Sequence, residues 1–238
     1  MMYTSTMKIV VIISSILILL LLGYCFVMKR SPLITVPSPT MTENPPQQEK
    51  SVKPFVIIAF GDSLTAGYGV TLDESYPMQL EKELQKRRYN IRVINMGVSG
   101  ETTTAGLERV PFILSQKPNL VLLGLGANDM LRSSSPQITK QNLASILEQF
   151  KTANIPVVML GMKSTSSNDK EYINTFNAIY PFLAKEYTLP FVPFFLEGVA
   201  LIPILNTGDG IHPNKIGYEY IIKNNILPVL IPTLEKII

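Results

Sequence analysis

The chain is poor in the residues that carry metal and redox chemistry. It has one cysteine, Cys25, so no disulfide can form within the chain, and cysteine usage does not indicate a redox compartment. No cluster of Cys and His is present to hold zinc, and we expect neither a metal nor another cofactor. The only histidine is His212, so any step that needs an imidazole near neutral pH must use this residue.

Long runs of one charge are also lacking. The formal net charge is +3, and charged residues of both signs are dispersed along the chain. The basic triplet Lys86-Arg87-Arg88 fits the end of a helix better than a nucleic-acid contact, so we expect no nucleic-acid partner. With 238 residues, the chain can build one sizeable core in the part that begins at Pro54.

What the sequence does contain begins with a nearly unbroken apolar run, Ile9–Met28. As a helix rising ~1.5 Å per residue, a run of this length spans a hydrocarbon core of ~30 Å. The absence of an Ala-x-Ala site, and the bulky Tyr24 before Cys25, favour an uncleaved membrane anchor over a cleaved signal. A cleaved, secreted form is the alternative, and a buried core helix is disfavoured by the length and apolar character of the run.

The charges that flank this run conflict on its orientation. Lys29 and Arg30 follow it and oppose an exported domain under the positive-inside rule, and Lys8 only partly offsets them. The start Met7-Lys8 before an apolar run nevertheless resembles an export signal. We therefore expect the rest of the chain to lie on the periplasmic or extracellular side of the membrane.

The segment Ser31–Lys53 has the composition of a linker. Prolines are scattered among Ser, Thr, Gln and Glu, and such a segment has too little apolar surface to offset the entropy lost on ordering. We divide the chain into a membrane anchor or signal segment at 1–30, a linker at 31–53, and a globular domain at 54–238. We expect this domain to be monomeric.

From Pro54 onward, short apolar runs alternate with helix-like segments. The expected strands are 55–60, 91–95, 120–124, 156–161 and 190–194. The expected helices are 73–88, 103–115, 139–153, 169–186 and a last helix from 215 toward the C-terminus. This alternation indicates an α/β fold, with a parallel sheet covered by helices on both faces.

The first apolar run ends abruptly at Gly61-Asp62-Ser63-Leu64. A glycine directly after a strand permits a sharp turn, which would place Ser63 at the C-terminal edge of the sheet, where open α/β folds bind ligands. A position between a strand and a helix suits a nucleophile, although an ordinary strand-to-helix turn is the alternative. The G-x-S-x-G turn of α/β-hydrolases is absent.

Three more polar stretches follow expected strands: Asn95–Glu101, Gly124–Asp129 and Asp209–Asn214. In a parallel sheet the loops after the strands open at one edge, so these stretches can converge on Ser63. Acyl transfer needs a nucleophile, a neutral base, an acid that orients the base, and donors for the oxyanion. Ser63, His212 and Asp209 offer the first three, and the Gly100 N–H and Asn128 side chain offer donors.

These residues resemble a known family. Gly61-Asp62-Ser63-Leu64, Gly100, Gly126-Ala127-Asn128-Asp129 and Asp209-Gly210-Ile211-His212-Pro213 resemble, in order and spacing, the four blocks of the GDSL or SGNH hydrolases. The resemblance covers essentially all of Pro54–Ile238. It is closest to the bacterial multifunctional esterases with acyl-CoA thioesterase, lysophospholipase and arylesterase activities. Relatives often have glycine in place of Ala127.

The resemblance implies a fold and roles for the residues. It implies a three-layer α/β/α sandwich of the flavodoxin-like type, with a five-stranded parallel sheet. It also implies Ser63 as nucleophile, His212 as base and Asp209 as its orienter, with the Ser63 N–H, the Gly100 N–H and the Asn128 side chain as oxyanion hole. The implied substrates are acyl esters or thioesters, with lysophospholipids as one option.

Other interpretations stay open at this point. A carbohydrate O-deacetylase would use the same residues, and a catalytically silent, membrane-tethered binding module would use none of them. Asn128 could be a turn residue and Asp209 a helix cap, although Asn214 suits the cap better. Asp62 is expected to hold the loop around Ser63.

Two segments leave the substrate open. The apolar run Leu189–Leu205 is expected to combine core packing with the border of an acyl-chain groove. Glu101 and Arg132–Ser135 are candidates for contact with substrate head groups.

Overall fold

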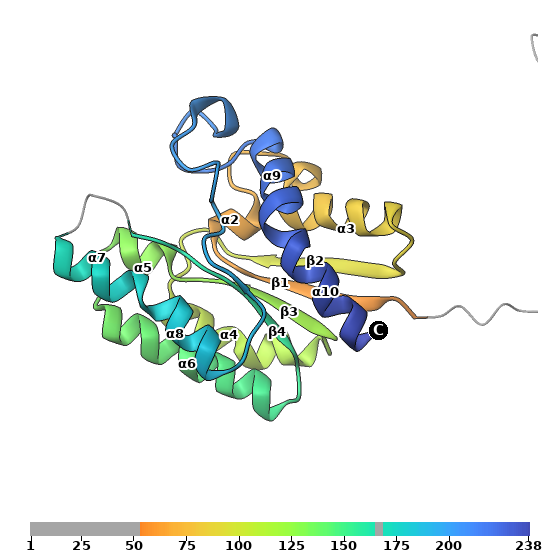
Figure 1. Ribbon diagram of the computed structural model, residues 1–238, viewed down its shortest axis with the longest axis horizontal. Coiled ribbons are helices and arrows are strands. Elements are labelled where there is room, and N and C mark those ends of the chain that lie inside the picture. The colour runs from red at the N-terminus through yellow and green to blue at the C-terminus, as the bar shows by residue number, and fades with distance from the viewer. Residues whose placement is uncertain (1–52, 165–168) are drawn as a thin grey trace, which may run out of the picture. The chain divides into compact units, whose positions relative to one another are not determined.

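The computed structural model describes residues 53–164 and 169–238, and these residues belong to one compact unit (Figure 1). Five parallel strands form a sheet in the order β2-β1-β3-β4-β5. The strands are β1 (Phe55–Gly61), β2 (Ile91–Gly97), β3 (Leu120–Gly124), β4 (Val157–Leu160) and β5 (Phe191–Val192). The predicted α/β fold with a five-stranded parallel sheet is therefore confirmed, and its strand order is flavodoxin-like.

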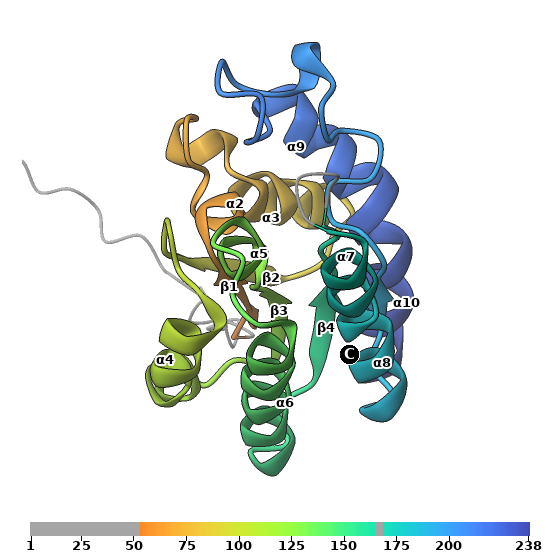
Figure 2. The same ribbon diagram turned by 90° about the vertical axis from the view of Figure 1, so that its left-hand side faces the viewer.

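Helices cover both faces of the sheet (Figures 1 and 2). One face carries α3 (Tyr76–Lys86), α9 (Lys215–Ile221) and α10 (Leu227–Ile237). The other carries α4 (Thr103–Ser115), α6 (Pro136–Thr152) and α8 (Ile179–Glu186). Right-handed crossovers from a central first strand produce this division, because the chain leaves β1 toward one edge and later returns toward the other.

The centre of the sheet forms the core. Ile57–Phe60 in β1 and Leu120–Leu122 in β3 are 0% exposed. Strands covered by helices on both sides need apolar residues at every position rather than at alternate ones. This requirement explains why both strands stand out as continuous apolar runs in the sequence.

The sheet register gathers the strand ends that carry polar loops. Gly61 pairs with Gly97 of β2 and with Gly124 of β3, so the loops after these strands leave at one edge. A Cβ at Gly97 would collide with the backbone of the short helix α2 (Ser63–Ala66). Glycine at this position thus lets α2 pack directly against the end of β2.

The structure corrects several helix boundaries. The predicted helix 73–88 is a 3₁₀ turn, η1 (Leu72–Glu74), followed by α3, because the Thr71–Glu74 capping box closes a separate turn and Pro77 starts the next helix. The predicted helix 169–186 is two helices, α7 (Lys170–Asn177) and α8. The break falls at Ala178, where Pro181 has no N–H to donate to the carbonyl of Asn177, the last residue of α7.

Other differences concern short elements. β5 is shorter than predicted because Pro190 and Pro193 flank it and cannot donate to a ladder. The short helices α2 and α5 (Ala127–Leu131) lie where only loops were expected. The last helix begins at Lys215 as predicted, and a π-helical turn, η3 (Ile222–Ile226), links α9 to α10.

The predicted anchor at Ile9–Met28 and nearly all of the predicted linker lie outside the described residues. Within 53–164 and 169–238, no helix combines the length and apolar character needed to cross a bilayer.

Candidate active site

Ser63 is the first residue of α2, directly after β1. Asp62 caps this helix, and its Oδ1 accepts a hydrogen bond from the Leu64 N–H at 3.0 Å. At the other end Gly67 adopts a left-handed conformation, with φ 84°. The helix is a single capped turn, so the position of the Ser63 side chain is fixed by backbone on both sides.

His212 and Asp209 lie in the loop between β5 and α9. The Thr207 N–H donates to the His212 carbonyl at 2.8 Å, and Asn206 forms an antiparallel bridge with Pro213. Asn214, not Asp209, caps α9, because its Oδ1 accepts from the Gly217 N–H at 3.0 Å. The alternative role of Asp209 as a helix cap is therefore wrong, and its carboxylate is free to face His212.

The structure brings Ser63, His212 and Asp209 into one hydrogen-bonded chain. The distance from His212 Nε2 to Ser63 Oγ is 2.8 Å, and the distance from His212 Nδ1 to Asp209 Oδ2 is 2.6 Å. An ionised carboxylate can only accept, so Nδ1 carries the proton and Nε2 accepts from the Ser63 hydroxyl. This is the protonation pattern in which an imidazole can take a proton from a serine.

Asp209 is held in its ionised form. Partial burial acts to raise its pKa, but the backbone N–H groups of His212 and Ile211 and the side chains of His212 and Thr207 donate to it. Together these hydrogen bonds hold the pKa of Asp209 well below its usual range. The carboxylate is therefore charged near neutral pH and accepts from His212 Nδ1.

The donors predicted for an oxyanion follow the neighbouring strands β2 and β3. Gly100 has φ 82°, and its carbonyl accepts from Arg132 Nη2 at 2.8 Å. Asn128 in α5 donates one amide hydrogen from Nδ2 to the Glu101 carbonyl at 3.0 Å. The amide nitrogen has two hydrogens, so one remains for a ligand.

A buried carboxylate connects the loop of Gly100 to α5. Asp129 is 2% exposed and accepts from the Thr103 N–H at 2.8 Å and from the Thr103 hydroxyl at 2.6 Å. Because Asp129 follows Asn128 in α5, this contact joins the start of α4 to the helix that carries the amide donor. The positions of Gly100 and Asn128 are thereby coupled.

Comparison with known proteins identifies the family. The sequence model of the GDSL-like lipase/acylhydrolase family matches residues 59–220, a range that contains all four motif blocks. The chain belongs to this family. Its GDSL sequence is Gly61–Leu64, and the protein is accordingly a hydrolase.

Several relatives of this GDSL protein are named enzymes. The chain is 39% identical over 166 residues to thioesterase 1/protease 1/lysophospholipase L1 of Escherichia coli K12, covering 69% of this chain and 78% of the relative. It is 35% identical over 179 residues to esterase TesA of Pseudomonas aeruginosa, covering 75% and 89%. The crystal structure of AlinE4, an SGNH-hydrolase family esterase, matches with a TM-score of 0.65 and 42% identity, covering 78% and 97%.

Two residues of this site were missed by the sequence analysis. The Tyr68 ring lies 4.7 Å from the His212 ring between centroids, and Thr207 Oγ1 donates to Asp209 Oδ1 at 2.8 Å. Tyr68 lies five residues after Ser63, and Thr207 lies two residues before Asp209. Their closeness to the motifs in the sequence could have identified both residues as candidates. A tyrosine or a threonine does not by itself indicate a role in a site.

The candidates for head-group contact do not all face the site. Glu101 is 5% exposed, and its carboxylate accepts from Arg109 Nε and Nη2, both at 2.6 Å. This buried, bidentate pair satisfies the Glu101 side chain, so its proposed contact with substrate is wrong. Arg132 is exposed and donates to the Gly100 carbonyl, which places its guanidinium beside the loop of the oxyanion donor.

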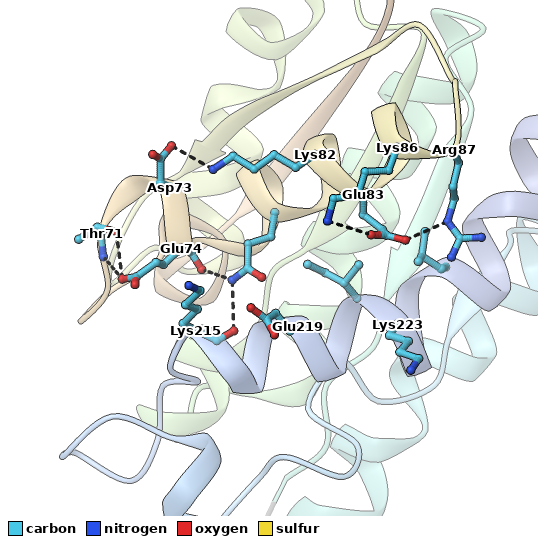
Figure 3. A pocket seen from close by; sticks show the side chains of 13 residues that line it. Thr71, Asp73, Glu74, Lys82, Glu83, Lys86, Arg87, Lys215, Glu219 and Lys223 are labelled. Atoms are coloured by element: carbon cyan, nitrogen blue, oxygen red, sulfur yellow. Dashed lines mark hydrogen bonds and ion pairs between the residues drawn. The ribbon is translucent and has the colours of Figure 1, made fainter.

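A groove of about 800 Å³ lies between α3 and α9, apart from the candidate active site (Figure 3). None of Ser63, Asp209 and His212 lines it. Its charges are largely paired with one another, as in the Lys82–Asp73 contact of 3.5 Å and the Glu83–Arg87 contact of 3.1 Å. In the described part of the chain, no three side chains of His, Cys, Asp or Glu gather to hold a metal ion.

Asp62 carries an unusual carboxyl group for a residue next to a nucleophile. It is 1% exposed, and Oδ2 has no hydrogen-bond partner within the described residues. Burial raises the pKa of Asp62 to about 7, although the Leu64 N–H opposes the rise. Asp62 was expected to hold the loop around Ser63, and its hydrogen bond from the Leu64 N–H agrees with this role. Burial of the charged form of Asp62 costs free energy.

Asp62→Asn should therefore change how stability depends on pH. A raised folded-state pKa means that the folded wild type binds the extra proton between about pH 4 and pH 7, so its stability falls as pH rises through that range. Asparagine keeps the acceptor for Leu64 and cannot ionise. From pH 4 to pH 8, the free energy of unfolding of the variant relative to wild type should rise by about 2–4 kcal/mol.

Chemical denaturation at several pH values measures this difference. Asp73→Asn, at an exposed carboxylate, is the matched control for loss of one negative charge. A constant difference between Asp62→Asn and wild type across the pH series would mean that Asp62 is ionised in the fold at acidic pH.

Proposed function

We propose that this chain hydrolyses acyl esters and thioesters through Ser63, His212 and Asp209, with an acyl-enzyme intermediate. The observation that carries the proposal is the continuous hydrogen-bonded chain from Ser63 Oγ through His212 to Asp209 Oδ2, with distances of 2.8 and 2.6 Å. The relatives named thioesterase, lysophospholipase and esterase support this choice of substrate class.

In the first half of the reaction, Ser63 Oγ bonds to the carbonyl carbon of the substrate while its proton passes to His212 Nε2. Asp209 stabilises the imidazolium that results. The tetrahedral intermediate then expels the alcohol or thiol, which takes the proton from Nε2. The acyl group remains on Ser63.

In the second half, water replaces the leaving group. His212 Nε2 takes a proton from the water as its oxygen bonds to the acyl carbon. The second tetrahedral intermediate collapses, the C–O bond to Ser63 breaks, and the proton returns to Ser63 Oγ. The carboxylic acid is released and the enzyme is regenerated with no net gain or loss of protons.

In both halves the carbonyl oxygen becomes negatively charged. We propose that the Ser63 N–H, the Gly100 N–H and the Asn128 side chain donate to it. The left-handed backbone at Gly100 and the contact of Asn128 with the Glu101 carbonyl support this role, because they fix both donors before substrate binds. Donors fixed in advance need no reorganisation during the reaction.

Asn128→Ala is expected to lower kcat by about 10²–10³ with a comparatively small change in KM. The charge on oxygen exists in the transition state and not in the bound ester, so the lost donor acts on the chemical step. Steady-state kinetics on a chromogenic ester, with a melting curve of each protein, measures both effects. An unchanged kcat with a raised KM would assign Asn128 to substrate binding, and a collapsed melting temperature would assign it to the turn.

The substrate class is tested by a series of acyl esters and thioesters of increasing chain length, with acetylated sugars as the rival series. Faster turnover of the longer acyl esters supports the proposal. Faster turnover of acetylated sugars would identify a carbohydrate O-deacetylase instead. Absence of turnover on every substrate would favour a silent binding module.

We also propose that Ile9–Met28 tethers the enzyme to a membrane, with the hydrolase domain on the periplasmic or extracellular side. The apolar run and the Pro-containing segment after it support this proposal. The full chain should stay in the membrane pellet after extraction with alkaline carbonate. Its release into the supernatant would contradict an integral anchor.

A further inference from the structure

The loop between β5 and α9 presents aliphatic side chains to solvent at its tip. Leu201 is 77% exposed, Ile204 is 76% exposed and Ile202 is 39% exposed. The chain carries no charged residue from Gly198 to Gly208. Single exposed aliphatic residues are ordinary, but a cluster of them on an uncharged loop marks an interaction surface. We name residues Leu201–Ile204 the apolar tip.

The tip is held outward by its base. Asn206 Nδ2 donates to the carbonyls of Val199 and Ile202, both at 2.8 Å, and Asn214 Nδ2 donates to the Ile204 carbonyl at 2.9 Å. Leu201 has φ 62°, a left-handed conformation that costs free energy for a residue with a branched side chain. A loop fixed by these contacts exposes its aliphatic residues as part of the fold.

The tip belongs to the same hydrogen-bonded loop as His212. Asn206, which holds the tip, bridges Pro213, and the next residue, Thr207, donates to the His212 carbonyl at 2.8 Å. Tyr68, which is 55% exposed and lies against the His212 ring, adds apolar surface at this end of the domain. Figures 1 and 2 show the loop projecting from the end of the domain at which α2 lies. Whatever the tip binds is therefore brought to the end of the domain that carries α2 and Ser63.

We propose that the apolar tip inserts into the surface of a phospholipid bilayer and seats the Ser63 site at that surface. The lack of charge favours lipid over a charged protein partner, because short loops bind the interface through buried apolar area. The chain itself supplies a reason for a bilayer to be near, since Ile9–Met28 is long and apolar enough to span one.

The length of chain before the domain permits this contact. Residues 31–53 reach at most roughly 83 Å when fully extended. A domain of this size has a diameter of about 40 Å. The fully extended segment is therefore longer than the domain is wide, so its length does not prevent the tip from reaching a bilayer.

The test uses the full chain in phosphatidylcholine vesicles, with Ser63→Ala to remove turnover and Cys25→Ser to remove the native thiol. Ile204→Cys is labelled with nitrobenzoxadiazole, and lipids with nitroxides on their acyl chains serve as quenchers. The matched control is Phe112→Cys. Phe112 is 53% exposed and lies near the C-terminal end of α4, at the end of the domain where the strands begin. We expect blue-shifted, quenched emission at position 204 only, and its persistence in about 1 M salt.

Equal emission at positions 204 and 112 would overturn the proposal, and so would loss of quenching in salt, which would indicate an ionic contact. A shielded label that lipid nitroxides do not quench, together with a dimer by cross-linking, would assign the tip to a second copy of the chain. None of these readouts depends on catalysis, so they are independent of the proposed function.

A second measurement rests on the proposed function and connects the tip to activity. Ile204→Asp should lower hydrolysis of a long-chain lysophospholipid embedded in vesicles by about tenfold, because a carboxylate opposes insertion. Hydrolysis of a short, soluble ester should be unchanged, and Phe112→Asp should change neither rate. An equal loss on both substrates would mean that the substitution damages the site rather than membrane contact, and would overturn the proposal.

Discussion

Ser63→Ala is expected to lower kcat for ester hydrolysis by about 10⁶-fold. The substitution removes the oxygen that forms the acyl-enzyme. His212 and Asp209 cannot replace this oxygen, because they act through Ser63. Ser63 Oγ bonds His212 Nε2 at 2.8 Å, and the loss of this contact should change the free energy of unfolding by only about 1 kcal/mol.

Initial rates on a chromogenic acyl ester and a denaturation curve measure the two effects. A serine-directed phosphonate gives an independent readout, since it should label the wild type at position 63 and leave the variant unlabelled. Retention of most turnover in a folded Ser63→Ala protein would refute the assignment of the nucleophile.

Asp209→Asn is expected to lower kcat by about 10⁴-fold. Asp209 Oδ1 accepts from Thr207 Oγ1 and from the Ile211 and His212 N–H groups, at 2.8 to 3.0 Å. These three donors should hold the carbonyl oxygen of asparagine in the same place. The amide nitrogen then faces His212 Nδ1 and donates to it, which moves the imidazole proton to Nε2. In this tautomer Nε2 cannot take the proton of Ser63.

The same contacts predict that the Asp209→Asn variant keeps its loop structure. Its melting temperature should stay close to that of the wild type. Loss of the loop structure would then not explain the lower kcat. Phosphonate labelling of Ser63 should slow together with kcat, because both need the base. An unchanged kcat would show that Asp209 does not orient His212.

Much of the fold could be predicted from local sequence. β1 and β3 read as continuous apolar runs because both faces of each strand are covered, and α4 occupies the predicted residues 103–115. The order of the motif blocks also placed Ser63, Asn128 and His212 after strands of one parallel sheet. Chain order along a parallel sheet fixes the edge at which loops emerge, so convergence at that edge followed from sequence.

Short helices and their boundaries could not be predicted in the same way. α2 and α5 are single turns that hold the candidate nucleophile and amide donor, and a turn is too short to show helical periodicity. The chain breaks between α7 and α8 just before Pro181, yet α4 continues through Pro111, so a proline in a helical pattern does not by itself locate a break.

The sequence by itself determined the family, the sheet and the types of residue available for chemistry, with one imidazole in the whole chain. Only the tertiary structure decided which side chains meet. It paired Glu101 with Arg109 inside the domain, and it separated neighbours of one apolar run, since Val199 is 0% exposed and Leu201 is 77% exposed. The physical reason is that the burial of a side chain depends on contacts between segments far apart in the chain. Local composition does not predict these contacts.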